Sequence, residues 1–245
     1  MQFKQRIQAI WSQFFPPPPR ENGDTLSNVP LPHGGPVTTK AAIDAYLEML
    51  FADIATYAPA PVPSLIVTGT MRCGKTLVAR RLARRNGMYH IPSDRLRHAT
   101  YITSDEATKL RVIKYIYKRL LLAHPTGLVL DGTVFLDHGV TLPQWAVRRG
   151  MVCVAIGYSH DTPARKARHM IAFRKTHDCW TSGRKSDAEL RRMARMIIGR
   201  SKDIKAQCAA NGWPYFDLDS GQFHAENRRI VRRIERQLHA ARSAP

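Results

Sequence analysis

The sequence has 245 residues, 44% of them hydrophobic, which supports one substantial domain with length left for an extension. Its apolar runs stay well short of about 18 residues, the N-terminus lacks a secretory pattern and the four cysteines form no CxxC pair, so we expect no membrane-spanning helix, disulfide framework or zinc knuckle. The formal net charge is +19: residues 1–60 carry four Lys/Arg against five Asp/Glu and the rest carries 34 against 14, which excludes a balanced surface after residue 60.

Residues 1–37 are predicted to be an extension, followed by a main domain over 38–245. Residues 1–15 have apolar side chains near one face of an amphipathic helix, Pro16–Pro19 end it, and 20–37 have the Gly, Pro, Asn and Ser content of a linker. The plainer interpretation is that this helix packs on its own domain or on a second copy in a homo-oligomer. The alternative is an anchor on a membrane surface or a partner protein.

The main domain is predicted to alternate strands and helices. A helix over 39–57, capped by Thr38 or Thr39, precedes the first strand. The predicted strands cover 64–68, 88–91, 128–130, 152–158 and 214–218. The predicted helices cover 75–86, 104–123, 139–149, 162–174, 186–210 and 223–241. This order indicates an α/β fold with a doubly wound, mainly parallel five-stranded sheet and helices on both faces.

The turn after the first strand fits the phosphate-binding pattern G-x-x-x-x-G-K-[ST]. Its strand–turn–helix context places backbone N–H groups and a helix N-terminus around a triphosphate. The predicted nucleotide-binding residues run in sequence order through this turn: Gly69, Thr70, Met71, Arg72, Cys73, Gly74, Lys75, Thr76 and Leu77. Lys75 would reach the β- and γ-phosphates, and the Thr76 hydroxyl would ligate Mg²⁺.

Acidic and basic residues follow the later strands, at the sheet edge where ligands bind in such folds. Asp131, after the third strand, is the candidate for holding Mg²⁺, either directly or through water; its alternative role is to cap the next turn. Asp94, after the second strand, is the candidate that accepts or orients the proton of an attacking hydroxyl, with an N-cap as the alternative. Arg95 beside it would bind an anionic substrate.

A basic segment follows the fourth strand, from about residue 162 to 190. Arg165 and Arg168 are three residues apart on one helix face, and guanidinium groups suit the charge that phosphoryl transfer spreads over oxygen atoms. Small residues at 181–183 indicate a closing segment. Most of the other basic residues here are interpreted as solvated surface.

The cysteines and histidines bear on compartment and metals. Cys73 lies within the phosphate-binding turn, which favours a reducing compartment and predicts a cytoplasmic protein. His169, His177 and Cys179 are near one another in sequence, but their spacing matches no ligand template, so we predict no metal site there.

Together these residues resemble the small P-loop kinases, a group that includes nucleoside monophosphate, shikimate, gluconate and zeta-toxin-like kinases. The resemblance covers about residues 64 to 240 and is carried by the 69–76 turn, by Asp94 with Arg95, and by Arg165 with Arg168. It implies ATP as the phosphoryl donor, Mg²⁺ as cofactor, and an acceptor that is anionic or bears a hydroxyl.

The resemblance also implies individual roles. Lys75, Thr76 and Asp131 would serve ATP and the metal, Asp94 and Arg95 the acceptor, and the two lid-type arginines would bind the phosphates as a lid closes. Segment 217–220 would lie near the adenine, mainly through backbone contacts. Asp131 and Gly132 match the Asp-Gly pair found after the third strand in nucleotide kinases, which implies that both also contact the substrate. Residues 133–135 read Thr-Val-Phe instead of Phe-Pro-Arg, which argues against a nucleoside monophosphate acceptor.

Three functions stay open from the sequence. The favoured one is a kinase for a small molecule or nucleotide. The second is a kinase acting on nucleic acid or another polyanion; basic stretches at 80–85 and 228–233 support it, although few aromatic residues interleave with their arginines. The third is a nucleotide-dependent regulatory ATPase without an acceptor.

Overall fold

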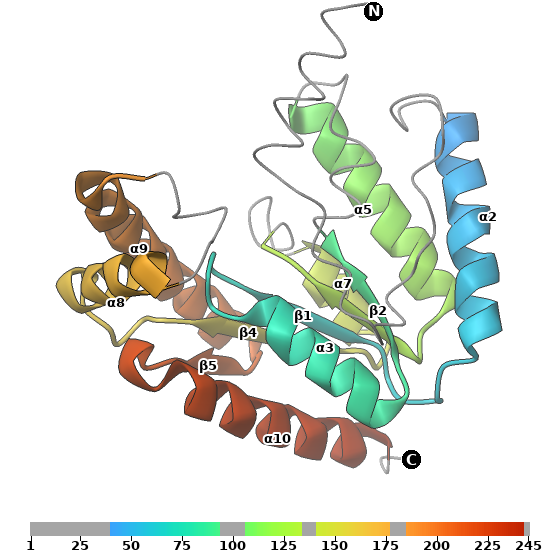
Figure 1. Cartoon of the computed structure of the whole chain (residues 1–245). Helices are drawn as coiled ribbons and strands as arrows, with labels where there is room; N and C mark the ends of the chain where they lie inside the picture. The colour runs from blue at the N-terminus through green and yellow to red at the C-terminus, as the bar shows by residue number, and fades with distance from the viewer. Residues whose placement is uncertain (1–39, 94–105, 134–140, 177–184, 243–245) are drawn as a thin grey trace, which may run out of the picture. The chain divides into compact units, whose positions relative to one another are not determined.

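The computed structural model describes residues 40–93, 106–133, 141–176 and 185–242 (Figure 1). These residues fall into two compact units. The larger unit comprises the described residues within 26–161 and 197–245, and the smaller one includes those within 162–196. The predicted helix at 1–15, the proline stop and the linker lie outside the described residues, so the division into 1–37 and 38–245 stays a prediction.

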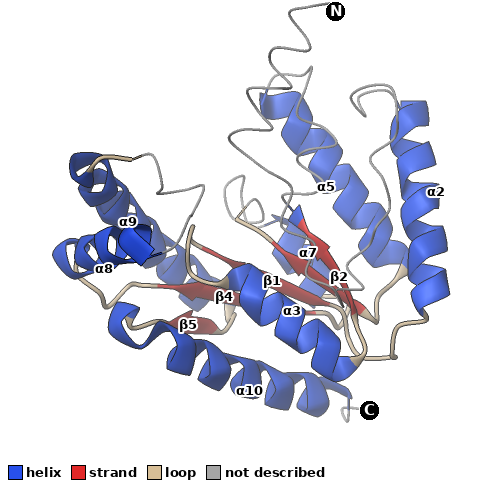
Figure 2. Cartoon of the chain, in the orientation of Figure 1, coloured by secondary structure: helices blue, strands red, loops and turns tan. Residues whose placement is uncertain are grey.

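The larger unit contains a five-stranded parallel sheet (Figure 2). In chain order its strands are β1 (Leu65–Gly69), β2 (Tyr89–Pro92), β3 (Leu128–Asp131), β4 (Val152–Gly157) and β5 (Tyr215–Asp217). Their spatial order is β2-β3-β1-β4-β5, and every pairing is parallel. All residues of β1 and β3 are buried, as expected for strands covered on both faces. The predicted parallel sheet is confirmed, and β1 is its central strand, with β3 and β2 on one side and β4 and β5 on the other.

Helices cover both faces of this sheet. The helices that the structure describes are α2 (Lys40–Tyr57), α3 (Lys75–Asn86), α5 (Glu106–Ala123), α7 (Thr141–Val147), α8 (Pro163–Thr176), α9 (Asp187–Asn211) and α10 (Phe223–Arg242), with a short 3₁₀ turn η1 (Ser220–Gln222). In Figure 1, α3 and α10 lie side by side over one face, and α2, α5 and α7 lie over the other. The doubly wound arrangement predicted from the sequence is therefore confirmed.

The helix ahead of β1 belongs to the core of the larger unit. Tyr46, Leu47, Leu50 and Ile54 of α2 are fully buried, and they pack in one cluster with apolar side chains of α5 and with Ile66 of β1. These side chains form the apolar stripe expected of a helix that packs one face on a core, and Phe51 on the same stripe is partly exposed.

Element boundaries differ from the predictions by a few residues. The helix predicted over 139–149 ends at Val147, and residues 148–150 form a turn that closes on Gly150 at a φ of 76°. That positive φ favours glycine and ends the helix. No helix among the described residues combines the length and the apolar content needed to cross a membrane.

Candidate functional site

The turn between β1 and α3 has the backbone of a phosphate-binding loop. Gly69 has a φ of 138°, and a Cβ there would overlap the carbonyl oxygen of Ile156 on β4, so no other residue fits. The amide of Thr70 donates to the same Ile156 oxygen at 3.2 Å. The register of β1 against β4, which pairs Gly69 with Ile156, therefore fixes where the loop begins.

The second half of the loop is held from the side by α10. Arg72 and Gly74 have φ values of 61° and 78°. A Cβ on Gly74 would lie 2.7 Å from Oδ1 of Asn227 and 3.0 Å from the ring of Phe223, so the start of α10 packs directly on the loop. Gly74 is the N-cap of α3 and offers no side-chain hydrogen bond, which leaves the amides of the first turn without a side-chain cap. Such amides bind anions readily.

Lys75 is folded back over the loop. Its Nζ donates to the carbonyl oxygen of Thr70 at 2.7 Å and lies 3.9 Å from Sγ of Cys73. Cys73 is buried, whereas Met71 is 41% exposed. The structure thus brings the predicted residues 69–77 together in one loop and the first turn of α3, and the Lys75 ammonium group is held against the loop backbone.

Thr76, Asp131 and His90 form a hydrogen-bonded chain beside the loop. The Thr76 hydroxyl donates to Oδ2 of Asp131 at 2.7 Å, and Nε2 of His90 lies 2.6 Å from Oδ1. Burial alone would raise the pKa of Asp131, but hydrogen bonds from His90 and Thr76 and the charges of His90 and Lys75 outweigh it and lower the pKa. An ionised carboxylate only accepts, so Nε2 of His90 carries the donated hydrogen.

His90 is a residue that the sequence reasoning did not single out. It lies in β2 between Tyr89 and Ile91, is 4% exposed, and within the described chain its Nδ1 has no hydrogen-bond partner. The available signal was a histidine inside a short apolar strand, where a buried imidazole needs a polar neighbour. Only the pairing of β2 with β3 shows that this neighbour is Asp131.

The Asp131–Gly132 pair is tied to β1 as well. The Gly132 amide donates to Val67 at 3.1 Å, and its carbonyl accepts from the Thr68 hydroxyl at 3.0 Å. These two bonds tie the residue after β3 to β1 and so hold the Asp131 carboxylate beside the first turn of α3. Gly132, predicted to contact substrate, is buried here and its backbone is engaged with β1.

Tyr158, directly after β4, hydrogen-bonds to the backbone of the 69–76 loop. Tyr158 Oη donates to the carbonyl oxygen of Arg72 at 2.8 Å, and the Tyr158 amide donates to Ser201 Oγ at 2.9 Å. Burial is the main cause that raises the pKa of Tyr158 well above its ordinary value, so the phenol stays protonated and keeps donating. Sequence reasoning missed this contact because 86 residues separate the two partners.

The segment after β5, expected near an adenine, is well ordered by hydrogen bonds. Asp219 caps η1 by accepting from the Gly221 amide at 2.7 Å. Asp217 accepts from the amide and hydroxyl of Ser159, both at 2.6 Å, and from Lys205 at 3.3 Å. The Asp217 carboxylate is therefore used to join β4, α9 and β5 rather than left open to a ligand.

The structure does not test the roles predicted for the remaining site residues. Asp94 and Arg95 lie outside the described residues. Arg165 and Arg168 lie on α8 in the smaller unit, Arg165 half-buried and Arg168 exposed, and the Thr162 hydroxyl caps their helix by accepting from the Arg165 amide at 3.2 Å. Their roles stay predictions.

Comparison with solved structures identifies the fold. A shikimate kinase from Bacteroides thetaiotaomicron is similar with a TM-score of 0.50 at 16% identity, over 71% of this chain and 99% of that one. A gluconokinase from Sinorhizobium meliloti 1021 is similar with a TM-score of 0.44 at 16% identity, over 76% of this chain and all of the other. No family model and no curated protein sequence matches. The chain therefore has the fold of the small P-loop kinases.

The residues beside the loop also fit the metal that this fold implies. Thr76 and Asp131 present a hydroxyl and an ionised carboxylate 2.7 Å apart, and Mg²⁺ prefers such hard oxygen ligands. His90 holds the other carboxylate oxygen and so orients the group, as outer partners of metal ligands commonly do.

Proposed function

We propose that this protein is an ATP- and Mg²⁺-dependent phosphotransferase that moves the γ-phosphoryl group of ATP to an acceptor bearing a hydroxyl or an anionic group. The observation that carries the proposal is the joint geometry of the 69–76 loop and the Thr76–Asp131–His90 chain. A turn with a purely structural role would not need Lys75 bound to the loop backbone, nor the buried Asp131 carboxylate hydrogen-bonded to the Thr76 hydroxyl of α3.

The roles on the nucleotide side follow from the positions of the groups at the loop. The first-turn amides of α3 and Lys75 bind the phosphates of ATP, and Thr76 and Asp131 hold the metal. Bound Mg²⁺ neutralises charge that develops on the phosphate oxygens. On the acceptor side, Asp94 takes or orients the hydroxyl proton, Arg95 binds the acceptor, and Arg165 and Arg168 bind the transferring group. These four roles rest on the sequence resemblance alone.

The first test is nucleotide binding by the intact chain. Calorimetric titration with Mg·ATP is expected to release heat with one site per chain, and Lys75→Ala is expected to weaken binding strongly because it removes the ammonium group that is held on the loop. Lys202→Ala, at an exposed lysine of α9, is the charge-matched control. Absence of heat with both Mg·ATP and Mg·GTP for the wild type would overturn the proposal.

The second test is transfer. The protein is incubated with labelled ATP, Mg²⁺ and fractionated metabolite pools, and labelled products are separated. Asp94→Asn is expected to abolish transfer while sparing the heat of ATP binding; persistent transfer would remove Asp94 from its role. ATP hydrolysis that no pool accelerates and that yields no labelled product would favour the regulatory ATPase over the phosphotransferase.

A nucleic-acid acceptor is the second candidate. It is favoured by the exposed arginines of α3 and α10, which belong to the same compact unit as the loop. The same transfer assay with oligonucleotides that end in free hydroxyl groups distinguishes it from a small-molecule acceptor.

A further inference from the structure

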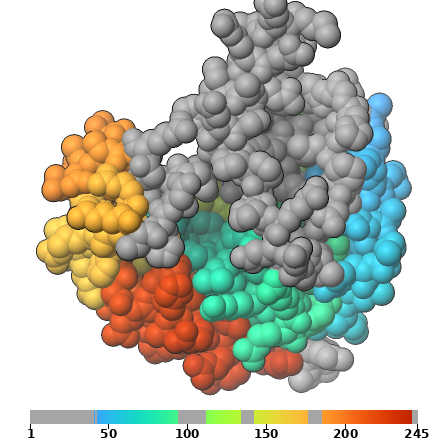
Figure 3. All heavy atoms as spheres, in the orientation of Figure 1, coloured from blue at the N-terminus to red at the C-terminus, as the bar shows by residue number. Residues whose placement is uncertain are grey.

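The two basic stretches of the sequence form one surface in the fold. α3 and α10 pack side by side on the same face of the sheet, and the exposed face of the pair is visible in Figure 3. The exposed arginines on these two helices are Arg84, Arg85, Arg228, Arg229, Arg232, Arg233 and Arg236. α3 contains no acidic residue, and the two of α10, Glu226 and Glu235, are only partly exposed. We call this surface the α3–α10 face.

The carboxylates of the α3–α10 face already have cationic partners. Glu235 pairs with Arg85 at 2.7 Å, and Glu226 lies 3.5 Å from Arg229. Among the described residues, Arg232, Arg233 and Arg236 pair with no carboxylate. These three guanidinium groups follow one another along α10 within little more than one turn, so their charge is available to a partner.

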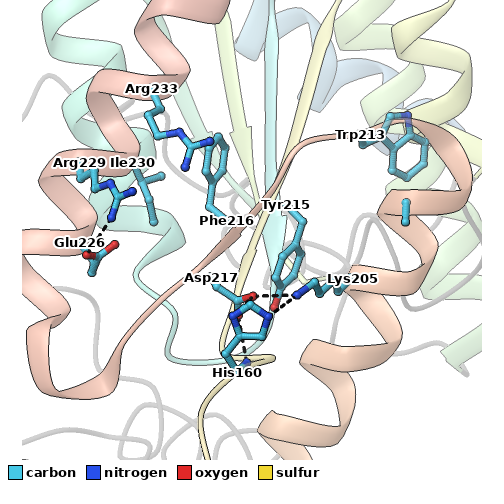
Figure 4. Close-up of a pocket in the computed structure, with 11 residues that line it drawn as sticks. His160, Lys205, Trp213, Tyr215, Phe216, Asp217, Glu226, Arg229, Ile230 and Arg233 are labelled. Atoms are coloured by element: carbon cyan, nitrogen blue, oxygen red, sulfur yellow. Dashed lines mark hydrogen bonds and ion pairs between the residues drawn. The ribbon is translucent and has the colours of Figure 1, made fainter.

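A recess opens beside these arginines, at the edge of the sheet. It has a volume of about 490 Å³, within the range of ligand-binding pockets, and is lined by β5, the end of α9 and the outer side of α10. Figure 4 shows Phe216 next to Arg233, with Arg229 nearby on α10, whereas Tyr215 and Trp213 lie toward Lys205 and α9. A second hollow of about 690 Å³ shares Arg229 and Arg233 with the first and continues along α10 to His239.

Aromatic and basic groups meet inside the recess. The guanidinium of Arg233 lies 5.0 Å above the ring centroid of Phe216, and Nζ of Lys205 lies 5.9 Å from that of Tyr215. Stacking on Phe216 fixes the plane of Arg233 while the side chain remains exposed. A base can stack on such a held guanidinium plane, while neighbouring arginines contact phosphates. Few aromatic residues interleave with these arginines in the sequence, because Phe216 and Tyr215 belong to β5 and meet α10 only in the fold.

We propose that the groove formed by these two hollows binds single-stranded nucleic acid, with phosphates along Arg232 and Arg236 and one base in the recess against Arg233. A double helix could bind the arginines through its phosphates, but its bases are stacked inside the duplex, so none could enter the recess. An anionic bilayer fits less well, because α10 buries Ile230, Val231, Ile234 and Leu238, and its partly buried Phe223 packs on the loop at Gly74.

The test uses the full-length protein without ATP. Fluorescence anisotropy of a labelled 20-nucleotide single-stranded RNA of mixed sequence is measured between 50 and 300 mM salt, with the matching duplex, heparin and phosphatidylserine vesicles as competitors. The variant carries Arg229→Gln, Arg232→Gln and Arg236→Gln. The control carries Arg191→Gln, Arg192→Gln and Arg195→Gln, which remove the same charge from exposed positions of α9.

The α10 variant is expected to lower the slope of log affinity against log salt by about two and to weaken binding on the order of 100-fold at 0.1 M salt, because each lost phosphate contact contributes about 0.7 to the slope. The α9 control should lose much less. A separate Phe216→Leu variant, which removes the ring under Arg233, is expected to reduce the preference for single strands over duplex.

Equal losses in the α9 and α10 variants would overturn the proposal, since binding would then follow net charge alone. Equal competition by heparin and duplex, or preferential capture by the vesicles, would overturn it as well. Circular dichroism checks that each variant is folded. The outcome is independent of the proposed phosphotransfer, because Lys75→Ala should retain the oligonucleotide binding that the α10 variant loses.

Discussion

Gly69 sits where two strands and the nucleotide loop meet, and its lack of a side chain is a requirement of that position. A Cβ would overlap the Ile156 carbonyl, and the φ of 138° is itself unfavourable for other residues. Gly69→Ala is therefore expected to destabilise the protein by more than about 3 kcal/mol and to abolish ATP binding. Urea unfolding monitored by circular dichroism measures the first effect and calorimetry the second.

Gly150→Ala is the matched control for this substitution. Gly150 also has a positive φ, of 76°, but a Cβ there would meet nothing within 4 Å. Only the cost of the left-handed backbone remains, about 1–2 kcal/mol. If Gly69→Ala cost no more than Gly150→Ala, the packing of the loop against β4 would not be as described.

His90 is expected to act on the metal through Asp131. His90→Ala removes the donor that holds Oδ1 of the carboxylate, and loss of such an outer partner typically weakens metal affinity or activity about 10- to 100-fold. The measurement is the Mg²⁺ concentration dependence of ATP turnover. His90→Asn, which keeps an N–H donor, should lose less. A folded His90→Ala variant with unchanged Mg²⁺ dependence would contradict this role.

The lowered pKa of Asp131 makes a further prediction about pH. A carboxyl whose pKa is lower in the folded state contributes stability above its unfolded pKa, about 3.9, and that contribution is lost as the pH falls through the folded pKa. The difference in unfolding free energy between the wild type and Asp131→Asn should therefore be constant above about pH 5 and shrink toward pH 2. Urea titrations across that range measure it; a difference that grew in acid would contradict the prediction.

The site residues fall into two groups: those that a short stretch of sequence predicts, and those whose role depends on a partner far away in the sequence. Gly69, Lys75 and Thr76 were predicted because one short loop fixes their spacing, and Asp131 because it ends a buried strand. His90 and Tyr158 were not, since their partners Asp131 and Arg72 are 41 and 86 residues away in sequence. A pattern read along the chain does not show which strand edges come together.

At the scale of elements, α2 offers a test of how the fold is held together. Leu50 is fully buried in the cluster that α2 shares with α5. Leu50→Ala is expected to cost about 2–5 kcal/mol in the free energy of unfolding, because it leaves a cavity in a packed core. Leu122→Ala on α5, where the side chain is 57% exposed, should change it by no more than about 0.5 kcal/mol.

Urea unfolding of both leucine variants decides whether α2 is part of the domain. Similar small effects would mean that α2 is an appendage. Its helical period and apolar stripe could be predicted from residues 39–57 alone, and so could α3, whose bounds match. The end of α7 at Val147 could not, because the closing turn depends on the backbone that Gly150 adopts.

For the whole molecule, the most direct prediction concerns stability with ligand. A nucleotide that binds only the folded state adds about 2.7 kcal/mol at a concentration 100 times its Kd, which corresponds to roughly 5–10 °C in Tm for a chain of this size. Thermal scans with and without Mg·ATP should show this rise for the wild type and not for Lys75→Ala. A rise of equal size in that variant would mean that ATP binds elsewhere.

The class of fold could be predicted for the part of the chain that contains the sheet, because five apolar segments alternate with amphipathic ones and a phosphate loop follows the first. The acceptor could not. The acceptor is selected by the shape of a pocket built from residues distant in sequence. The candidates Asp94 and Arg95 indicate the charge of an acceptor that would fit, but they do not indicate its shape. The location of the positive charge could not be predicted either, because only the fold shows that α3 and α10 pack side by side and form one basic surface.

The two outer strands of the sheet have a consequence for self-association. β2 spans four residues and ends at Pro92, which has no N–H to offer, and β5 spans three. Strands this short present few unpaired backbone groups to another chain, so extending the sheet into a second copy would gain little. If this protein forms dimers, we expect them to join through helical surfaces. Pairing of two sheets edge to edge into one of ten strands is disfavoured, because the outer strands are too short to hold it together.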